Sequence, residues 1–404
     1  MKILVALPRF PYPLLKGDQL RAFYFLQELS KDHELYVLCV SDSRCQDHEI
    51  QVKSFCKHLE IIILNKFRLL KNLTEALFSD IPFQVAYFKH PQFKRRFAEI
   101  CEAIKPDICF VQLIRMGPNI PDTCQVPRYL DYMDCFTAGY EKRAKLSNWF
   151  MRFWVSVEAK RLRKYEGVIF SRFQGHSIIS EADKAALPEA IRQQITIIPN
   201  GVSSYFFEEL PQKTEREYLV IFTGNMGYYP NIEAVRYLVN QIMPIIWQEI
   251  PTAKVCIAGA NPASEVLKLA KDKRVTVTGY VPDIRLWLLN ATCFVAPLFS
   301  GSGLQNKLLE AMAVGVPVIT SSMANAALKA PKTTAILEAN SPQEFAQAIL
   351  KLTKTKDQNK SLIMNAREYI HQQYHWPTIT KKLVADFEKV YCQSSVQGKN
   401  MSKT

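Results

Sequence analysis

The chain has 404 residues, of which 48% are hydrophobic, so it can bury a large core and is long for a single domain. Its formal charge of +13 at pH 7 is shared almost equally between the two halves. No zinc-finger, helix-turn-helix or RNP-type signature accompanies the charge, so nucleic acid is not the expected partner.

The N-terminal segment and the hydropathy pattern predict a cytoplasmic protein. MKILVALP is a short apolar run that ends at Pro8, well before the length of a signal-peptide core. No window offers about 20 consecutive apolar residues, so no transmembrane helix is expected. The ten cysteines show neither CxxC nor Cys/His metal spacing. We expect them to be reduced, buried thiols without a structural metal.

In the first half of the chain, apolar strand-like runs alternate with amphipathic helices. This alternation is typical of a parallel sheet with helices on both faces. It predicts a Rossmann-like, doubly wound domain over residues 1–202. The predicted strands are 2–8, 34–41, 107–114, 126–134, 176–180 and 195–202, and the predicted helices include 21–31 and 92–104.

The segment 142–164, KRAKLSNWFMRFWVSVEAKRLRK, combines basic and aromatic residues. Eight Lys and Arg stand against a single acidic residue, Glu158, and four aromatic residues, Trp149, Phe150, Phe153 and Trp154, lie between the basic clusters. A basic, aromatic helix suits an anionic membrane surface, which the basic patch at 89–97 could extend. The alternative is a helix whose aromatic side chains belong to the core and whose cations are merely solvated.

A mixed-charge linker, 203–217, precedes a second alternating set, which predicts a second Rossmann-like domain over 218–370. The C-terminal part reads as helices with a kink near Trp376-Pro377. We expect a last helix over 371–392 and a disordered tail over 393–404. The strands predicted in the second domain are 218–224, 253–259, 275–280, 291–298 and 316–321.

The stretch FSGSGLQNKLLEAMAVGVPVITSS, 299–322, predicts a turn followed by a helix at the carboxyl end of a strand. Ligands of doubly wound sheets bind at this edge, where backbone N–H groups of a helix start can approach an anion. The groups expected there are those of Ser302, Gly303 and Leu304. The helix is predicted to end before Gly315.

Lys307 and Glu310 lie three residues apart and share a face of that helix. Lys307 can meet a phosphate, and Glu310 can accept hydrogen bonds from ribose hydroxyls, which suits a nucleoside diphosphate. The alternative is structural: Ser302 and Gln305 form a capping box, and Lys307 pairs with Glu310 on the surface.

Two further strand-to-helix turns contain glycine. FTGNMGYYPN places Gly224, Asn225 and Gly227 at the same sheet edge, with Asn231 as the expected N-cap. LPRFPYPLLKGD is the corresponding loop of the first domain, with Gly17 ahead of a helix. Each turn alone is a weak signal, but together they favour a ligand in a cleft between the domains.

Several motifs together resemble a known family. IIPNGV (197–202), FTGN, TGYVPDIR (278–285) and GSGLQNKLLEAMAVGVPVITS are similar to the group 1 (family 4) retaining glycosyltransferases of the GT-B fold. More narrowly, KGDQLRAFYFLQEL, FTGNMGYYPN and LQNKLLEAMA resemble sugar transferases associated with bacterial exopolysaccharide and protein-sorting loci.

The resemblance implies an α/β protein with two Rossmann-like domains facing a central cleft and a C-terminal helix crossing back to the first domain. It implies transfer of a sugar, with retention, from a nucleotide sugar in the second domain to an acceptor in the first. Glu310 would bind ribose, Lys307 would lie near the diphosphate, and the backbone of Val281 near the base. Gly17 would face the phosphates and the acceptor.

This chain departs from the family pattern at three places. The first glutamate of the family's E-x7-E motif falls on Ser302, and the loop that usually carries Arg and Lys reads GNMGYYPN, which leaves Asn225 and backbone amides. In place of the usual histidine, LDYMDC offers Asp131 or Asp134 near the donor sugar. Either aspartate could equally cap the following helix, a role we favour for Asp131.

The implied chemistry uses a UDP- or GDP-sugar as substrate and neither a cofactor nor a metal, in keeping with the absence of an evident DxD motif. A lipid-linked or polysaccharide precursor at the inner face of the cell membrane is the expected acceptor. The alternatives are another GT-B activity, such as an epimerase or phosphorylase, and a degenerate protein that binds nucleotide sugar without turnover.

Overall fold

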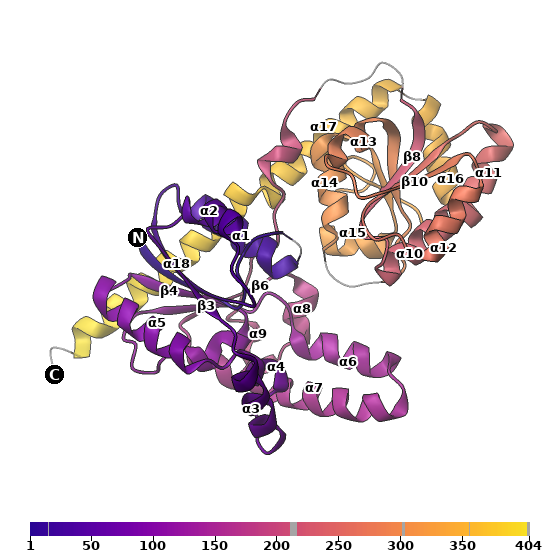
Figure 1. Ribbon diagram of the computed structural model, residues 1–404. Helices are drawn as coiled ribbons and strands as arrows, with labels where there is room; N and C mark the ends of the chain where they lie inside the picture. The colour runs from indigo at the N-terminus through magenta and orange to yellow at the C-terminus, as the bar shows by residue number, and fades with distance from the viewer. Residues whose placement is uncertain (15, 211–215, 301–303, 355, 402–404) are drawn as a thin grey trace. The chain divides into compact units, whose positions relative to one another are not determined.

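The computed structural model describes residues 1–14, 16–210, 216–300, 304–354 and 356–401. The chain forms two compact units, each a parallel sheet with helices around it (Figure 1). Unit 1 comprises Met1–Pro199 and Ile379–Thr404, and unit 2 comprises Asn200–Thr378. The last helix thus returns the chain to the unit in which it began.

Unit 1 contains a seven-stranded sheet of order β3-β2-β1-β4-β5-β6-β7, with every neighbouring pair parallel. The strands are β1 (Lys2–Leu7), β2 (Glu34–Ser41), β3 (His58–Ile63), β4 (Ile108–Gln112), β5 (Arg128–Asp131), β6 (Gly175–Ile178) and β7 (Thr196–Ile197). The helices are α1 (Gly17–Leu29), α2 (Gln46–Lys53), α3 (Lys66–Leu77), α4 (Phe83–Phe88), α5 (Pro91–Ile104), η1 (Ile114–Asn119), α6 (Phe136–Leu146), α7 (Trp149–Phe170), α8 (Glu181–Ala186), α9 (Glu189–Arg192) and most of α18 (Trp376–Met401).

Both faces of this sheet are covered, which explains why its central strands are continuous apolar runs rather than alternating ones. On one face, Leu4 of β1 belongs to the same buried cluster as Phe93 and Phe97 of α5. On the other face, the Phe110 ring of β4 meets Phe25 of α1 and Phe387 of α18, with ring centroids 6.1 and 5.4 Å apart. The C-terminal helix is therefore part of the core of unit 1.

Unit 2 contains a six-stranded parallel sheet of order β10-β9-β8-β11-β12-β13. Its strands are β8 (Tyr218–Thr223), β9 (Val255–Ala258), β10 (Val275–Gly279), β11 (Ala291–Ala296), β12 (Val318–Thr320) and β13 (Leu337–Glu338). Its helices are η2 (Ser204–Phe207), α10 (Tyr229–Tyr237), η3 (Leu238–Ile242), α11 (Met243–Glu249), α12 (Ser264–Leu267), η4 (Lys268–Lys271), α13 (Ile284–Leu289), α14 (Asn306–Val314), α15 (Ser322–Leu328), α16 (Pro342–Lys354) and α17 (Lys356–Tyr374).

The structure differs from the sequence-based predictions at a few element ends. The edge strands β3 and β13 were not predicted, and Asn231 lies inside α10, whose N-cap is Tyr228. The helical run breaks at His375, close to the predicted kink. Helix α18 continues to Met401, where we expected a disordered tail from residue 393.

Candidate functional site

The strand order of unit 2 reverses between β8 and β11, which are hydrogen-bonded neighbours. At such a switch point, the carboxyl ends of the strands are where doubly wound sheets bind ligands. The loop after β8 contains Gly224 and Asn225, and the chain after β11 leads to α14, which carries Lys307 and Glu310. The tertiary structure therefore brings the predicted glycine turn and the predicted helix to one place.

Lys307 is held by polar contacts at this edge. Its Nζ donates hydrogen bonds to Asn231 Oδ1 at 2.5 Å and to Gln305 Oε1 at 3.3 Å, and it lies 5.3 Å from the centroid of the Phe222 ring. None of these groups is a carboxylate. Burial lowers the pKa of Lys307 to about 8. The amine remains mostly protonated at pH 7 and lacks a nearby counter-ion among these contacts, so it suits an incoming phosphate.

Gly224 is required by the close approach of this loop to Lys307. Its φ is +150°, and a Cβ here would lie 2.8 Å from Asn231 Nδ2 and 3.4 Å from Lys307 Cε. The Asn231 Nδ2 also donates to the carbonyl of Asn225 at 2.8 Å, and the Gly227 N–H donates to Asn225 Oδ1 at 3.0 Å. Asn231 thus joins the loop to Lys307, a role that the expected N-cap position did not suggest.

Glu310 lies one turn along α14 from Lys307. Protein atoms surround its carboxylate densely, and this desolvation raises its pKa to about 7, opposed by the positive charge of Lys307. Within the described part of the chain, no group donates a hydrogen bond to Glu310 and no ion pair joins it to Lys307. The surface ion pair of the structural alternative is therefore absent, and the carboxylate has free acceptor sites.

The remaining predicted residues of unit 2 have different outcomes. Helix α14 begins at Asn306, its N-cap Gln305 makes no side-chain capping hydrogen bond, and Leu304 is half-buried in the chain before it. Val281 is half-buried in the loop after β10. Ser302 and Gly303 lie outside the described residues, so the capping box is not seen.

Unit 1 has its own switch point, between β1 and β4. A pocket of about 630 Å³ opens near the carboxyl ends of these strands and of β2 and β3. Gly17 is the first residue of α1, and a Cβ there would lie 3.1 Å from Met133 Cε. The pocket is lined by residues that include Arg9, Phe10, Tyr12, Tyr87, Phe88 and Arg115.

Asp131 and Asp134 have different environments. Asp131 is fully buried at the end of β5, where it accepts hydrogen bonds from Arg21 Nε at 2.7 Å, Arg21 Nη2 at 3.0 Å and Ser177 Oγ at 2.9 Å. It is an internal ion-pair partner, not the helix cap that we favoured. Asp134 retains solvent contact, yet desolvation by surrounding atoms and the charge of Asp183 raise its pKa to about 6. Asp134 is thus the aspartate available to a ligand.

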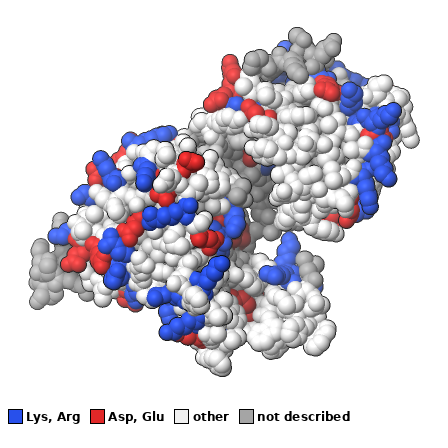
Figure 2. Space-filling model, viewed as in Figure 1, with Lys and Arg blue, Asp and Glu red and all other residues white. Residues whose placement is uncertain are grey.

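Helices α6 and α7 lie side by side as an antiparallel hairpin of unit 1 (Figure 1). Four aromatic side chains at the start of α7, Trp149, Phe150, Phe153 and Trp154, are between 44% and 84% exposed. Figure 2 shows the end of the hairpin as a largely uncharged surface. Glu158, the one acidic residue of the segment 142–164, is buried and accepts hydrogen bonds from the backbone of α4. The exposed aromatics therefore do not belong to the core of unit 1.

The described helices include none that is both long and apolar enough to span a bilayer.

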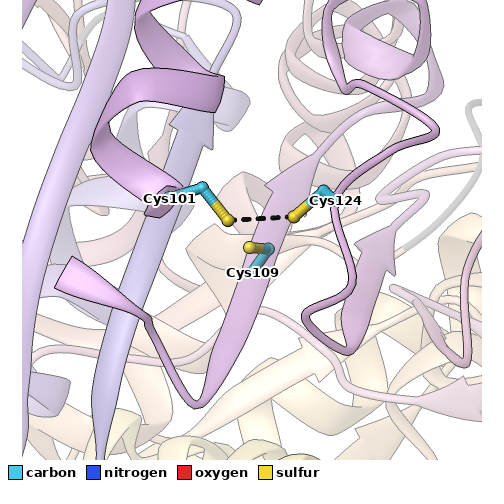
Figure 3. Close-up of side chains that lie close together, drawn as sticks. All are labelled: Cys101, Cys109 and Cys124. Atoms are coloured by element: carbon cyan, nitrogen blue, oxygen red, sulfur yellow. Dashed lines mark hydrogen bonds between the residues drawn. The ribbon is translucent and has the colours of Figure 1, made fainter. Parts of the chain in front are cut away.

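Three of the cysteines come together in unit 1, near the amino end of β4 (Figure 3). The Sγ atoms of Cys101, Cys109 and Cys124 all lie within 4.8 Å of one another, and those of Cys101 and Cys124 are 2.9 Å apart. Thiols are the ligands that soft metal ions prefer, so this group could hold one. Its sequence spacing gave no such signal, because the three residues come from α5, β4 and a loop.

Residues 217–355 match the family model described as Glycosyl transferases group 1. An uncharacterized 44.6 kDa protein in the cps region of Klebsiella pneumoniae is 26% identical over 163 residues, which are 38% of this chain and 42% of that protein. The GDP-mannose-dependent alpha-(1-6)-phosphatidylinositol monomannoside mannosyltransferase of Mycobacterium tuberculosis is 31% identical over 160 residues, 36% of this chain and 41% of that enzyme. The chain thus spans about two fifths of the length of these curated relatives.

Solved structures match nearly the whole chain. Sucrose-phosphate synthase from Thermosynechococcus elongatus has a TM-score of 0.63 at 13% identity, covering 97% of this chain and 100% of that one. HepE of Anabaena, in complex with UDP, has a TM-score of 0.64 at 12% identity, covering 96% and 100%. The protein therefore has the GT-B fold. Within that fold, residues 217–355 are similar to the group 1 glycosyltransferases.

Proposed function

We propose that this protein transfers a sugar, with retention, from a UDP- or GDP-sugar to a lipid-linked or polysaccharide precursor of a cell-surface glycan. The observation that carries the proposal is the position of Lys307, whose amine lies at the switch point of the matched domain beside Gly224 and Asn231. The names of the relatives support the donor class, since one uses GDP-mannose and one neighbour was solved with UDP.

In the proposed reaction, the donor diphosphate lies at the start of α14. As the bond between the anomeric carbon and the phosphate oxygen breaks, negative charge grows on the diphosphate, where Lys307 and backbone N–H groups stabilise it. The acceptor oxygen bonds to the anomeric carbon on the same face, and its proton passes to the departing phosphate oxygen. Glu310 accepts hydrogen bonds from the ribose, and Asp134 belongs to the acceptor side, in unit 1.

The exposed side chains of the α6–α7 hairpin favour an acceptor that is bound to a membrane. Exposed Trp and Phe side chains prefer the boundary between headgroups and acyl chains, and cations are attracted to anionic lipids. Lys142, Arg143, Lys145 and Arg152 are exposed on the hairpin together with these aromatics. We propose that it docks on the inner face of the cell membrane, where a lipid-linked acceptor would be found.

The test is nucleoside diphosphate release from a panel of UDP- and GDP-sugars, with membrane lipid extract and with a metal chelator in parallel. We expect release from one donor that resists the chelator, because Lys307 supplies the positive charge. Lys307→Ala and Glu310→Ala should each reduce release by about 10- to 100-fold, the effect of losing one charged hydrogen bond. The anomeric configuration of the product, read by NMR, tests retention.

A donor that binds without any release, with or without the lipid extract, would instead identify a degenerate nucleotide-sugar-binding protein. That alternative is favoured by Ser302 in place of the first motif glutamate and by the loop without Arg or Lys. Binding that is lost in Lys307→Ala would then place the donor at the same site.

A further inference from the structure

The pocket of unit 1 contains a buried cation, Arg115, that has no role in the proposed binding of the donor. Arg115 lies on η1, just after β4, and only 9% of the residue is exposed. Its guanidinium carbon is 4.9 Å from the centroid of the Phe88 ring and 4.7 Å from that of the Phe136 ring. Aromatic faces attract a cation, but they accept few of its hydrogen bonds. Arg115 is therefore a buried cation in an aromatic setting.

The hydrogen bonding of Arg115 is incomplete. No residue in the described ranges accepts a hydrogen bond from its buried Nε, and none forms an ion pair with it. Asp18, whose charge acts on Arg115, is already paired with Arg9. Burial and the charge of Arg9 lower the pKa of Arg115 to about 10, so it stays protonated near neutral pH. A buried N–H of a charged group that lacks an acceptor destabilises a fold, and the unsatisfied Nε therefore favours a ligand as the missing partner.

A second guanidinium approaches the same place. Arg9 lies 5.9 Å from the Phe88 ring that Arg115 also contacts, so two cations repel each other across one pocket. Lys16 and Arg44 line the exposed part of the pocket. The acidic residues Asp42 and Glu49 also line it, so the positive charge is concentrated at its inner end rather than spread evenly.

We propose that this pocket binds an oxyanion on the acceptor, either a sugar phosphate or a sugar carboxylate, and that Arg115 is its buried ligand. The inference rests on the proposed function, which supplies a sugar acceptor for unit 1. The planar guanidinium matches both oxyanions with two parallel hydrogen bonds. The rings of Tyr12 and Tyr87 line the same pocket and suit the face of a sugar. Its volume of about 630 Å³ is that of a small-molecule site.

The experiment measures binding of three probes to the full chain without donor: a hexose 1-phosphate, a hexuronic acid and the neutral hexose, at equal ionic strength. The variants are Arg115→Met, Arg44→Gln at the exposed part of the pocket, and Arg95→Gln, an exposed cation of α5, as the control. We expect one charged probe to bind and the neutral hexose not to. Arg115→Met should weaken binding about 10- to 100-fold, the effect of losing a charged hydrogen-bonding partner, and Arg95→Gln should not.

The melting temperature of the free protein separates a ligand role from a structural one. If Arg115 serves to bind an anion, Arg115→Met removes a buried cation whose Nε has no acceptor, and the melting temperature of the free protein should stay equal or rise. If Arg115 has a structural role, the melting temperature should fall. Binding of the phosphate but not the uronate identifies a phosphorylated acceptor, and the reverse identifies an acidic sugar.

Equal binding of all three probes, or no charged probe binding to the wild type, would overturn the inference. So would unchanged binding in Arg115→Met, whatever the result for Arg44→Gln. Nucleoside diphosphate release, measured on the same preparation, reports separately on the proposed function. Nucleoside diphosphate release without oxyanion binding would refute only the oxyanion site in the pocket. Oxyanion binding without nucleoside diphosphate release would refute only the proposed sugar transfer.

Discussion

Lys307 and Glu310 occupy one helix with pKa values shifted toward each other, to about 8 and about 7. Donor binding as proposed needs a charged lysine for the diphosphate and a charged glutamate for the ribose. Affinity should therefore rise as pH increases through about 7 and fall as pH increases through about 8, with its maximum between the two.

Calorimetric titration with a nucleotide sugar tests this profile, because its diphosphate does not titrate in that range. In Glu310→Gln, the rise in affinity through about pH 7 should disappear. In Lys307→Arg, the fall in affinity through about pH 8 should disappear. A profile that is flat in the wild type, or unchanged in both variants, would show that the pair does not contact the donor.

Asp131 and Asp134 are three residues apart, and their opposite environments predict opposite effects of mutation. Asp131→Asn breaks a fully buried ion pair with Arg21 and should lower the free energy of unfolding by about 3–5 kcal/mol. Asp134→Asn should leave the free energy of unfolding unchanged or slightly higher. The raised pKa means that ionisation of Asp134 destabilises the native state as pH rises from about 3.8 to about 6, and asparagine carries no such charge.

Urea unfolding of both variants, together with nucleoside diphosphate release, distinguishes the two roles. We expect Asp134→Asn to reduce release without affecting stability. A stable Asp131→Asn would contradict the internal ion pair, and full activity of Asp134→Asn would remove this residue from the site.

At the scale of elements, helix α7 of the α6–α7 hairpin has one part that packs on unit 1 and another that is exposed. Val155, Ala159 and Leu162 of α7 are buried, while the aromatics at its start are exposed. The helix therefore attaches to unit 1 by its later turns and presents its first turns to the surroundings. Large exposed apolar patches of this kind mark interaction surfaces.

Sedimentation with lipid vesicles tests the hairpin. Lys145→Gln and Arg152→Gln should each weaken binding to anionic vesicles by about fivefold, since one cation near such a surface contributes about 1 kcal/mol. The double variant Trp149→Ala and Trp154→Ala should weaken binding further. Tyr391→Ala, an exposed aromatic of α18, is the control and should bind as the wild type. Equal binding of all variants would rule out the hairpin as the membrane surface.

At the scale of the whole molecule, the last helix determines how the two units depend on each other. Ile379, Leu383, Phe387 and Val390 of α18 are buried in unit 1, and Tyr129 Oη donates a hydrogen bond to Asp386 at 3.0 Å. Unit 1 therefore needs the C-terminal end of the chain, whereas unit 2 is one continuous segment.

Truncation after Thr378 should accordingly prevent cooperative unfolding of unit 1, while residues 200–378 alone should fold and bind the donor nucleotide. In the full chain, Phe387→Ala should lower the free energy of unfolding by about 3–5 kcal/mol. Cys392→Ser, at an exposed position of the same helix, should have no effect. Circular dichroism and denaturant unfolding provide the measurement, and cooperative unfolding of unit 1 without α18 would contradict the prediction.

The sequence by itself determined the two α/β units, most strands and the donor-side residues of α14. Continuous apolar strands and glycine turns are local signals, and strand ends fix where loops must lie, so Gly224, Lys307 and Glu310 could be placed at one sheet edge in advance. The edge strand β3 was missed because only Ile61 and Ile62 are buried in it, and its pairing with β2 defines it.

Only the tertiary structure decided which polar side chains have partners. Asn231 bridges the loop and Lys307, Asp131 is neutralised by Arg21, Arg115 is buried beside Phe88, and the cysteines of three separate segments meet. These facts depend on contacts between residues far apart in the chain. Burial and hydrogen-bond satisfaction are properties of the packed molecule, so periodicity and spacing along the sequence cannot report them.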